Sequence, residues 1–272
     1  MKNFVEKTIG DIQTVFADLF YSEEMARRKG LFQRLDPRVK MFSVLSLITA
    51  VNFCKTIPAL ILMIGYVMIL AVGSRVPLAR YLWRVSVVSV IFTGTIALPS
   101  IFNIVRPGEP FWLITEHLYI TKPGLSGAGM LILRSFGSVS LIYLWTATTP
   151  WAEILKSLSV LKIPAPFVAT LEMAHRYIFL GLEVAANLFT ARKSRSLGKS
   201  AGKDDRRFVA GIMGHLFIRT TMLGEEVYQA MLSRGYSGEM KTISQFRISL
   251  ADYRWMIFNI VLFISAIVLK IF

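Results

Sequence analysis

Apolar residues gather in five long runs along the chain, and polar stretches separate them. Two of the runs, 57–73 and 85–103, hold no charged residue. The other three are 41–54, 127–148 and 255–269. A helix that crosses a membrane needs about 20 mostly apolar residues, and fewer where flanking basic side chains extend to the interface. The pattern therefore predicts about five transmembrane helices.

Basic residues at and within these runs need an explanation, because a charge inside a membrane is costly. Lys40 and Lys55 flank the run 41–54, and we expect them to extend to the two interfaces. Arg134 interrupts the run 127–148 near its outer end. It either extends to the interface, pairs inside the protein or contacts a substrate.

Three further stretches place apolar residues on one side at helical spacing, which is typical of amphipathic helices. The first lies near the N-terminus and predicts a helix at the membrane interface or against a partner; its apolar residues are Val5, Ile9, Ile12, Phe16, Leu19 and Phe20. The second follows Pro164 and Pro166 and carries Phe167, Leu171, Ala174, Ile178, Leu182, Ala185 and Phe189. The third carries Phe208, Ile212, Leu216, Leu223, Val227 and Met231. Gly235 follows it and predicts a helix end that turns left-handed.

The distribution of basic residues predicts the orientation in the membrane. Arginine and lysine are frequent before the first run, between the second and third, and throughout 149–254, whereas the alternate loops hold few. By the positive-inside rule, the N-terminus and 149–254 are cytoplasmic and the C-terminus is outside. We therefore predict a multi-pass protein of a prokaryotic cytoplasmic membrane, with four parts: 1–38, an N-terminal interfacial segment; 39–148, four transmembrane helices; 149–254, a cytoplasmic region; and 255–272, a last transmembrane helix.

Composition favours a membrane protein, and together with the helical patterns above it predicts an all-α membrane fold. Of the 272 residues 54% are hydrophobic and 18% are charged, where soluble domains have about 25% charged residues. The net charge of +14 alone is compatible with nucleic-acid binding. However, the basic stretch 191–207 lacks interleaved aromatic residues, so we expect membrane lipid and no nucleic acid as a partner. The single cysteine, Cys54, excludes an intrachain disulfide. The polar residues 1–10 show no signal peptide.

Motifs for enzyme chemistry are weak. Gly198-Lys199-Ser200 resembles the end of a phosphate-binding loop, but position 193 is lysine where the motif needs glycine, and no buried strand precedes it. Glu172 and His175 have the spacing of a helical metal pair but lack a second helix with a matching pair. We therefore expect no catalytic, cofactor-binding or metal-binding residue in this chain, and no enzyme activity.

Two arginines stand between small residues at the ends of the two long amphipathic helices. Arg195 lies between Ser194 and Ser196. Arg234 lies between Ser233 and Gly235. A solvated loop that follows the positive-inside rule explains most of the basic residues nearby. It explains this repeated arrangement less well, which favours helix ends that dock on a soluble partner.

With these motifs, most of the chain resembles the transmembrane T component, of CbiQ type, of an energy-coupling factor (ECF) importer for cobalt or nickel. The resemblance rests on three segments: Leu35-Asp36-Pro37-Arg38-Val39-Lys40; the helix 164–195 with His175-Arg176-Tyr177; and Ala230-Met231-Leu232-Ser233-Arg234-Gly235-Tyr236. The first arginine motif departs from the family form, because serine follows Arg195 where glycine is often found.

The resemblance implies a transport subunit with long cytoplasmic coupling helices. Their two arginine motifs would enter grooves on two ATP-binding-cassette ATPase subunits, which bind the ATP. The motion would pass to a separate substrate-binding membrane subunit, the S component, which holds the metal. Two alternatives stay open: a T component of a vitamin importer, and an autonomous membrane transporter. The second should show repeated halves and broken helices at mid-membrane.

The charge pattern makes the topology testable. In a Cys54→Ala background, we expect an impermeant thiol reagent to label Thr115→Cys in intact cells, and Ser200→Cys only after the membrane is opened. Labelling of position 200 in intact cells would show that the orientation is reversed.

Overall fold

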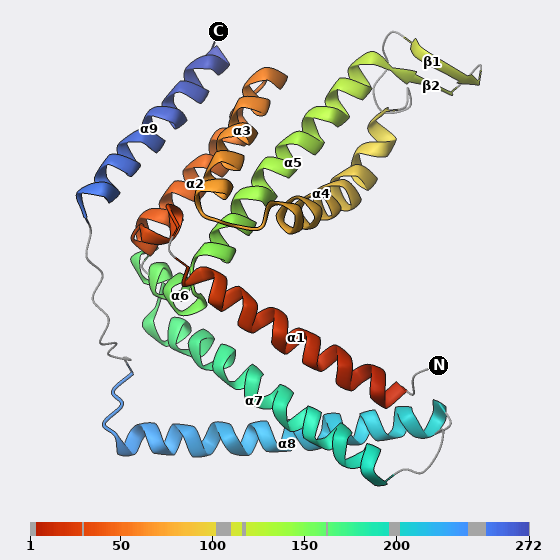
Figure 1. Cartoon of the computed structure of the whole chain (residues 1–272), viewed down its shortest axis with the longest axis vertical. Coiled ribbons are helices and arrows are strands. Elements are labelled where there is room, and N and C mark those ends of the chain that lie inside the picture. The colour runs from red at the N-terminus through yellow and green to blue at the C-terminus, as the bar shows by residue number, and fades with distance from the viewer. Residues whose placement is uncertain are drawn as a thin grey trace. The chain divides into compact units, whose positions relative to one another are not determined.

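The computed structural model describes residues 4–28, 30–101, 110–115, 118–161, 163–195, 202–238 and 249–271 (Figure 1). It is built almost entirely of helices, so the predicted all-α membrane fold is confirmed. The helices are α1 Phe4–Ala26, α2 Pro37–Phe53, α3 Ile57–Gly73, α4 Leu78–Ile101, α5 Lys122–Thr148, α6 Trp151–Leu158, α7 Ala165–Arg195, α8 Gly202–Ser233 and α9 Leu250–Ile271. Short 3₁₀ turns cover Phe32–Arg34 and Ser159–Leu161.

One element is absent from the sequence prediction. Strands β1, Pro110–Thr115, and β2, Leu118–Thr121, pair antiparallel in a hairpin between α4 and α5. The five apolar runs do each fall on one helix, in order α2, α3, α4, α5 and α9, except that Cys54 caps α2 and residues 102–103 lie outside the described part.

The chain divides into two compact units. One, here called the apolar unit, holds residues 25–154 and 246–272; the other, the amphipathic unit, holds residues 1–24 and 155–245. Two of the three boundaries between the units fall inside α1 and α6, and the third, between residues 245 and 246, lies outside the described part. The four sequence ranges proposed above as parts of the chain stay predictions.

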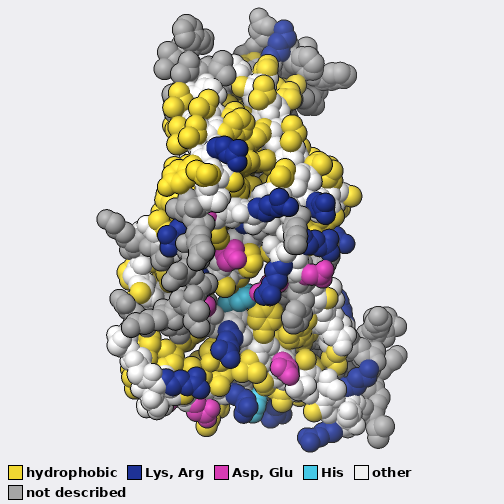
Figure 2. All heavy atoms as spheres, turned by 60° about the vertical axis from the view of Figure 1, so that its left-hand side comes forward, with side chains coloured by type: hydrophobic (Ala, Val, Ile, Leu, Met, Phe, Trp, Pro, Cys, Tyr) yellow, Lys and Arg dark blue, Asp and Glu magenta, His cyan; other side chains and the backbone are white. Residues whose placement is uncertain are grey.

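The apolar unit exposes many large apolar side chains besides those that form its buried core. On α4, Trp83 is 72% exposed and Ile96 is 74% exposed, whereas Tyr81 and Ser89 on the same helix are buried. Yellow apolar side chains dominate the upper part of Figure 2, over this unit. Among the described helices, α4 and α5 are long and apolar enough to cross a membrane, and α3 is more apolar than either but has 17 residues. Apolar side chains outside and polar ones inside are the arrangement that a lipid solvent favours.

Hydrogen bonds made by side chains of α4 join it to α5 inside this unit. The Tyr81 hydroxyl donates to the Ser140 carbonyl over 3.1 Å and contacts the Ser140 hydroxyl. About three turns further along α4, the Thr93 hydroxyl donates to the Ser135 hydroxyl over 2.6 Å. These partners replace the water that polar groups cannot find in a lipid, and they fix the register of the two helices.

The motif at residues 35–40 joins α2 to α9. The Asp36 carboxylate caps α2 by accepting from the Arg38 amide over 2.9 Å, and the Asp36 amide donates to the Asp252 carboxylate over 3.0 Å. Asp252 also accepts from the Ser249 amide over 2.7 Å, at the start of α9. One buried aspartate thereby ties together two helices that are more than 200 residues apart in the chain.

Lys40 does not extend to an interface, so that prediction is wrong. Its side chain is 1% exposed, and its ammonium donates to the Gln33 and Thr148 carbonyls over 3.3 and 3.4 Å. The carboxylates of Glu153, Asp36 and Asp252 lie within electrostatic reach. These acceptors and carboxylates compensate the charge, which explains why a lysine can be buried here. Thr148, Glu153 and Asp252 come from segments far away in the sequence.

Arg134 pairs inside the protein. Its guanidinium donates to the Cys54 carbonyl, at the C-terminal end of α2. The carbonyls of a helix C-terminus carry partial negative charge and attract a cation. Of the three roles open for Arg134 from the sequence, the structure supports internal pairing.

Candidate functional site

The amphipathic unit is organised around the packing of α7 on α8. Phe189 on α7 and Ile212 on α8 are buried together, with Leu188, Phe208 and Leu216 partly buried around them. The rings of Phe189 and Phe208 meet edge to face with centroids 5.7 Å apart. Phe189 of the α7 stripe thus packs against Phe208, Ile212 and Leu216 of the α8 stripe, whereas Phe167 and Ile178 of the α7 stripe are exposed.

The helix α1 covers the same cluster. Ile9 and Ile12 pack against it, and the Phe16 ring lies 6.4 Å from that of Phe179 on α7 (Figure 1). The sequence predicted that this stripe faces the membrane or a partner, whereas these three residues contact helices of their own chain. The sequence did not predict this packing, because no local pattern shows the apolar surface that α7 and α8 offer. A place at the membrane interface or against a partner stays a prediction. The side chains of Val5, Leu19 and Phe20 lie outside the description.

The first arginine motif ends α7. The Ser194 hydroxyl donates back to the Thr190 carbonyl over 3.2 Å, and Arg195 is the last helical residue and is exposed. Ser196 lies outside the described residues. A basic residue at this end of a helix is favoured by the helix dipole, so the position is also good for the stability of α7.

The second motif ends α8 in a left-handed cap. Gly235 has a φ of +82°, and its amide donates to the Leu232 carbonyl over 2.9 Å. The Tyr236 amide donates to the Met231 carbonyl over 3.0 Å. This pair of hydrogen bonds is the Schellman arrangement, which needs a residue at ease with positive φ. The predicted end of the helix at Gly235 is confirmed, and Arg234 stands immediately before it.

The two arginines have one feature in common beyond their neighbours in sequence. Within the described residues, neither the Arg195 nor the Arg234 guanidinium has a hydrogen-bond or ion-pair partner, and both are exposed. Arg192, one turn before Arg195, differs: its guanidinium pairs with the Asp205 carboxylate over 2.9 Å. The sequence placed Arg192 among the solvated charges, and only the structure separates it from Arg195.

The structure does not bring the two motifs together. Arg195 lies at the end of α7 that contacts the start of α8, and Arg234 lies at the far end of α8. The 32 residues of α8 span about 48 Å at 1.5 Å per residue. Two separate contacts, rather than one combined site, are what this spacing permits.

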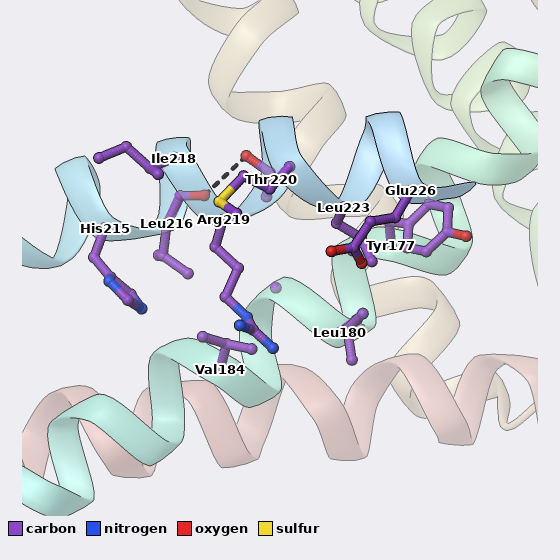
Figure 3. Close-up of a pocket in the computed structure, with 12 residues that line it drawn as sticks. Tyr177, Leu180, Val184, His215, Leu216, Ile218, Arg219, Thr220, Leu223 and Glu226 are labelled. Carbon is purple, nitrogen blue, oxygen red and sulfur yellow. Dashed lines mark hydrogen bonds between the residues drawn. The ribbon is translucent and has the colours of Figure 1, made fainter. Parts of the chain in front are cut away.

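Between the motifs, α7 and α8 enclose a groove of about 250 Å³ that the sequence analysis missed. It is lined mainly by apolar residues, with Tyr177, His215, Arg219 and Glu226 at its edges. In Figure 3, the Arg219 side chain extends from α8 toward Val184 on α7. The α7 residues that line the groove lie beside the apolar stripe of α7 rather than on it. The helical spacing of apolar residues therefore did not indicate the groove.

The remaining candidates carry little chemistry. Residues 198–200 lie outside the described part. His175 packs edge to face on the Phe179 ring, with centroids 5.1 Å apart. No group of three or more histidine, cysteine, aspartate or glutamate side chains that could hold a metal is found in the part of the chain that the structure describes.

Comparison with known proteins decides the family. The family model CbiQ, described as cobalt transport protein, matches residues 29–243. The chain belongs to this family. The match covers both arginine motifs and the segment 35–40. Members of the family are transport components of membranes, so the chain is a membrane transport component and not an enzyme.

Individual relatives agree with the family. An uncharacterized protein of Methanocaldococcus jannaschii is 34% identical over 94% of this chain and 89% of its own length. The energy-coupling factor transporter transmembrane protein EcfT of Listeria innocua is 27% identical over 87% of this chain and 90% of its own. The cobalt transport protein CbiQ of Rhodobacter capsulatus is 26% identical over 63% of this chain and 66% of its own. This member of the CbiQ family is accordingly a T component of the ECF type.

The cap of α8 gives a prediction with a matched control. We expect Gly235→Ala to destabilise the end of α8 by about 1 kcal/mol, because an alanine at this positive φ is strained. Gly224→Ala, in the middle of the same helix with open space around its Cα, should be neutral or stabilising. Hydrogen exchange of the last turn of α8 measures both. Equal protection in the two variants would contradict a cap that depends on Gly235.

Proposed function

We propose that Arg195 and Arg234 are the contacts through which this T component docks on two ATP-binding-cassette ATPase subunits. The observation that carries the proposal is that both are exposed at the ends of long helices, with no partner in the described part of their own chain. Each arginine would pair with a carboxylate in a groove of one ATPase subunit.

The chemistry of the guanidinium suits such a contact. Its planar fork holds a carboxylate through two parallel hydrogen bonds and stays charged when water is excluded. Ser194, Ser233 and Gly235 are small, so the helix ends can approach the backbone of a partner closely. The Ser194 and Ser233 hydroxyls bond back to their own helices and leave the arginines as the groups that project outward.

Helix stability alone is the simpler explanation of these arginines. A cation in the last turn of an exposed helix contributes about 0.3–1 kcal/mol through the helix dipole. This accounts for a basic residue at each end but requires neither small neighbours nor the same arrangement twice. Arg192, which is in the last turn of α7 as well, has its own carboxylate. The docking role therefore favours Arg195 and Arg234 over their basic neighbours.

The proposed mechanism passes motion along α7 and α8. Closure of the ATPase subunits on ATP would displace the two helix ends, and the displacement would shift or tilt a substrate-binding membrane subunit. The family description and the name of the Rhodobacter relative both refer to cobalt, so we propose cobalt or nickel as the cargo, held by that other subunit. The names of the EcfT relatives mention no metal, which keeps vitamin import as the second candidate.

The same proposal fixes the orientation. Both arginine motifs must face the ATPases, so the N-terminus and residues 149–254 are placed in the cytoplasm, as the loop charges indicate. The helices α2, α3, α4, α5 and α9 would then cross the membrane. Metal ions and ATP are thus proposed to bind the partner subunits rather than this chain.

Substitution of the two arginines tests the proposal. We expect Arg195→Ala and Arg234→Ala each to weaken ATPase binding by about 2–5 kcal/mol, because the partner carboxylate stays buried and unpaired. The double variant should nearly abolish metal uptake. Arg→Lys should rescue only in part, since an ammonium cannot form the bidentate contact, and Arg→Glu should be worse than alanine.

Arg207→Ala and Lys199→Ala are the controls, because they remove basic residues of the same region that belong to neither arginine motif. Uptake and co-purification of the subunits are measured across the set. Wild-type transport by Arg234→Glu, or an equal loss in the two controls, would show that these arginines only serve the positive charge of the cytoplasmic face.

A further inference from the structure

Arg192 is held more firmly than a solvated arginine. The side chains of Arg192 and Asp205 are only 14% and 13% exposed, and their ion pair is 2.9 Å long. The centre of the Arg192 guanidinium also lies 4.0 Å from the centroid of the Phe208 ring. A cation that is removed from water in this way gains from both the carboxylate and the aromatic face.

The position of the pair adds to its strength. Arg192 is in the last turn of α7 and Asp205 is in the first turn of α8. A cation at a helix C-terminus and an anion at a helix N-terminus are each stabilised by the helix dipole. The ion pair therefore joins two helix ends that each favour the charge they carry.

The aromatic cluster continues this contact into the unit. Phe208 contacts both the Arg192 guanidinium and, edge to face, the Phe189 ring, and Phe189 is buried with Ile212. Ile9 and Ile12 of α1 close the same cluster. The last turn of α7 is thus fixed to the first two turns of α8, one turn before Arg195.

We propose that Arg192, Asp205 and Phe208 form a clamp that positions Arg195 relative to α8, and so sets its separation from Arg234. The inference rests on the proposed function of the two arginine motifs. Arg192 is a positioning residue, because it acts through the placement of Arg195, and α8, which is about 48 Å long, separates the two docking points. The partner that fits is a pair of ATPase subunits whose grooves have a fixed spacing.

The clamp is tested in the full importer complex with Arg192→Ala, Asp205→Asn and Arg192→Lys. We expect the first two to lower uptake per assembled complex about five- to tenfold, as lost ion-pair and cation–π contacts allow, while ATP hydrolysis continues. Arg192→Lys keeps the charge beside Asp205 and Phe208, and should recover much of the uptake. Arg207→Ala removes a neighbouring exposed arginine and should leave uptake unchanged.

A spectroscopic distance measures the clamp independently of transport. Spin labels at Thr190→Cys and Met213→Cys, in a Cys54→Ala background, report how α7 lies on α8. The distance distribution should be narrow in the parent and in Arg192→Lys, and broad in Arg192→Ala. Unchanged distances and uptake in Arg192→Ala would overturn the clamp. Broadening in Arg192→Ala combined with normal transport by Arg195→Ala would instead overturn the docking role and leave the clamp in place.

Discussion

A positive charge that leaves water needs an anion or a set of carbonyl oxygens, and this requirement organises the whole molecule. Lys40 is buried among carbonyls and carboxylates, Arg134 meets the carbonyl end of α2, and Arg192 pairs with Asp205. Arg195 and Arg234 have no such group in the described part of the chain. Both charges are hydrated at the exposed helix ends. Where another protein covers these ends and excludes water, a carboxylate of that protein would have to pair with each arginine.

The two units solve opposite solvation problems. The apolar unit turns large apolar side chains outward and joins its helices through polar contacts such as Tyr81–Ser140 and Asp36–Asp252. Lipid provides no hydrogen bonds, so these contacts hold the helices in register. The amphipathic unit packs apolar residues of α1, α7 and α8 against one another and exposes most of its charged side chains, with the Arg192–Asp205 pair as an exception. A transport component needs both, because it must stay in the membrane and also present a surface to soluble subunits.

Local patterns predicted what depends on local physics. The apolar runs fall on helices, and Gly235 ends α8, because hydropathy and positive φ act within a few residues. The burial of Lys40 and the packing of Ile9, Ile12 and Phe16 were missed, since each depends on residues far away in the chain. The difference between Arg192 and Arg195 was missed for the same reason: both are basic residues of one helix turn, and only Asp205 and Phe208 distinguish them. The hairpin of β1 and β2 was missed as well, although its paired residues are close together in the sequence.

The docking of the two helix ends can be measured directly by cross-linking. A photoreactive residue in place of Ser194 or Ser233 leaves both arginines intact and lies beside each of them. In the assembled importer, both positions should form covalent products with the ATP-binding subunits, and Met213, on the exposed middle of α8, should form far fewer. Products with lipid or the substrate-binding subunit alone, or equal products from position 213, would contradict the assignment of Arg195 and Arg234 as the ATPase contacts.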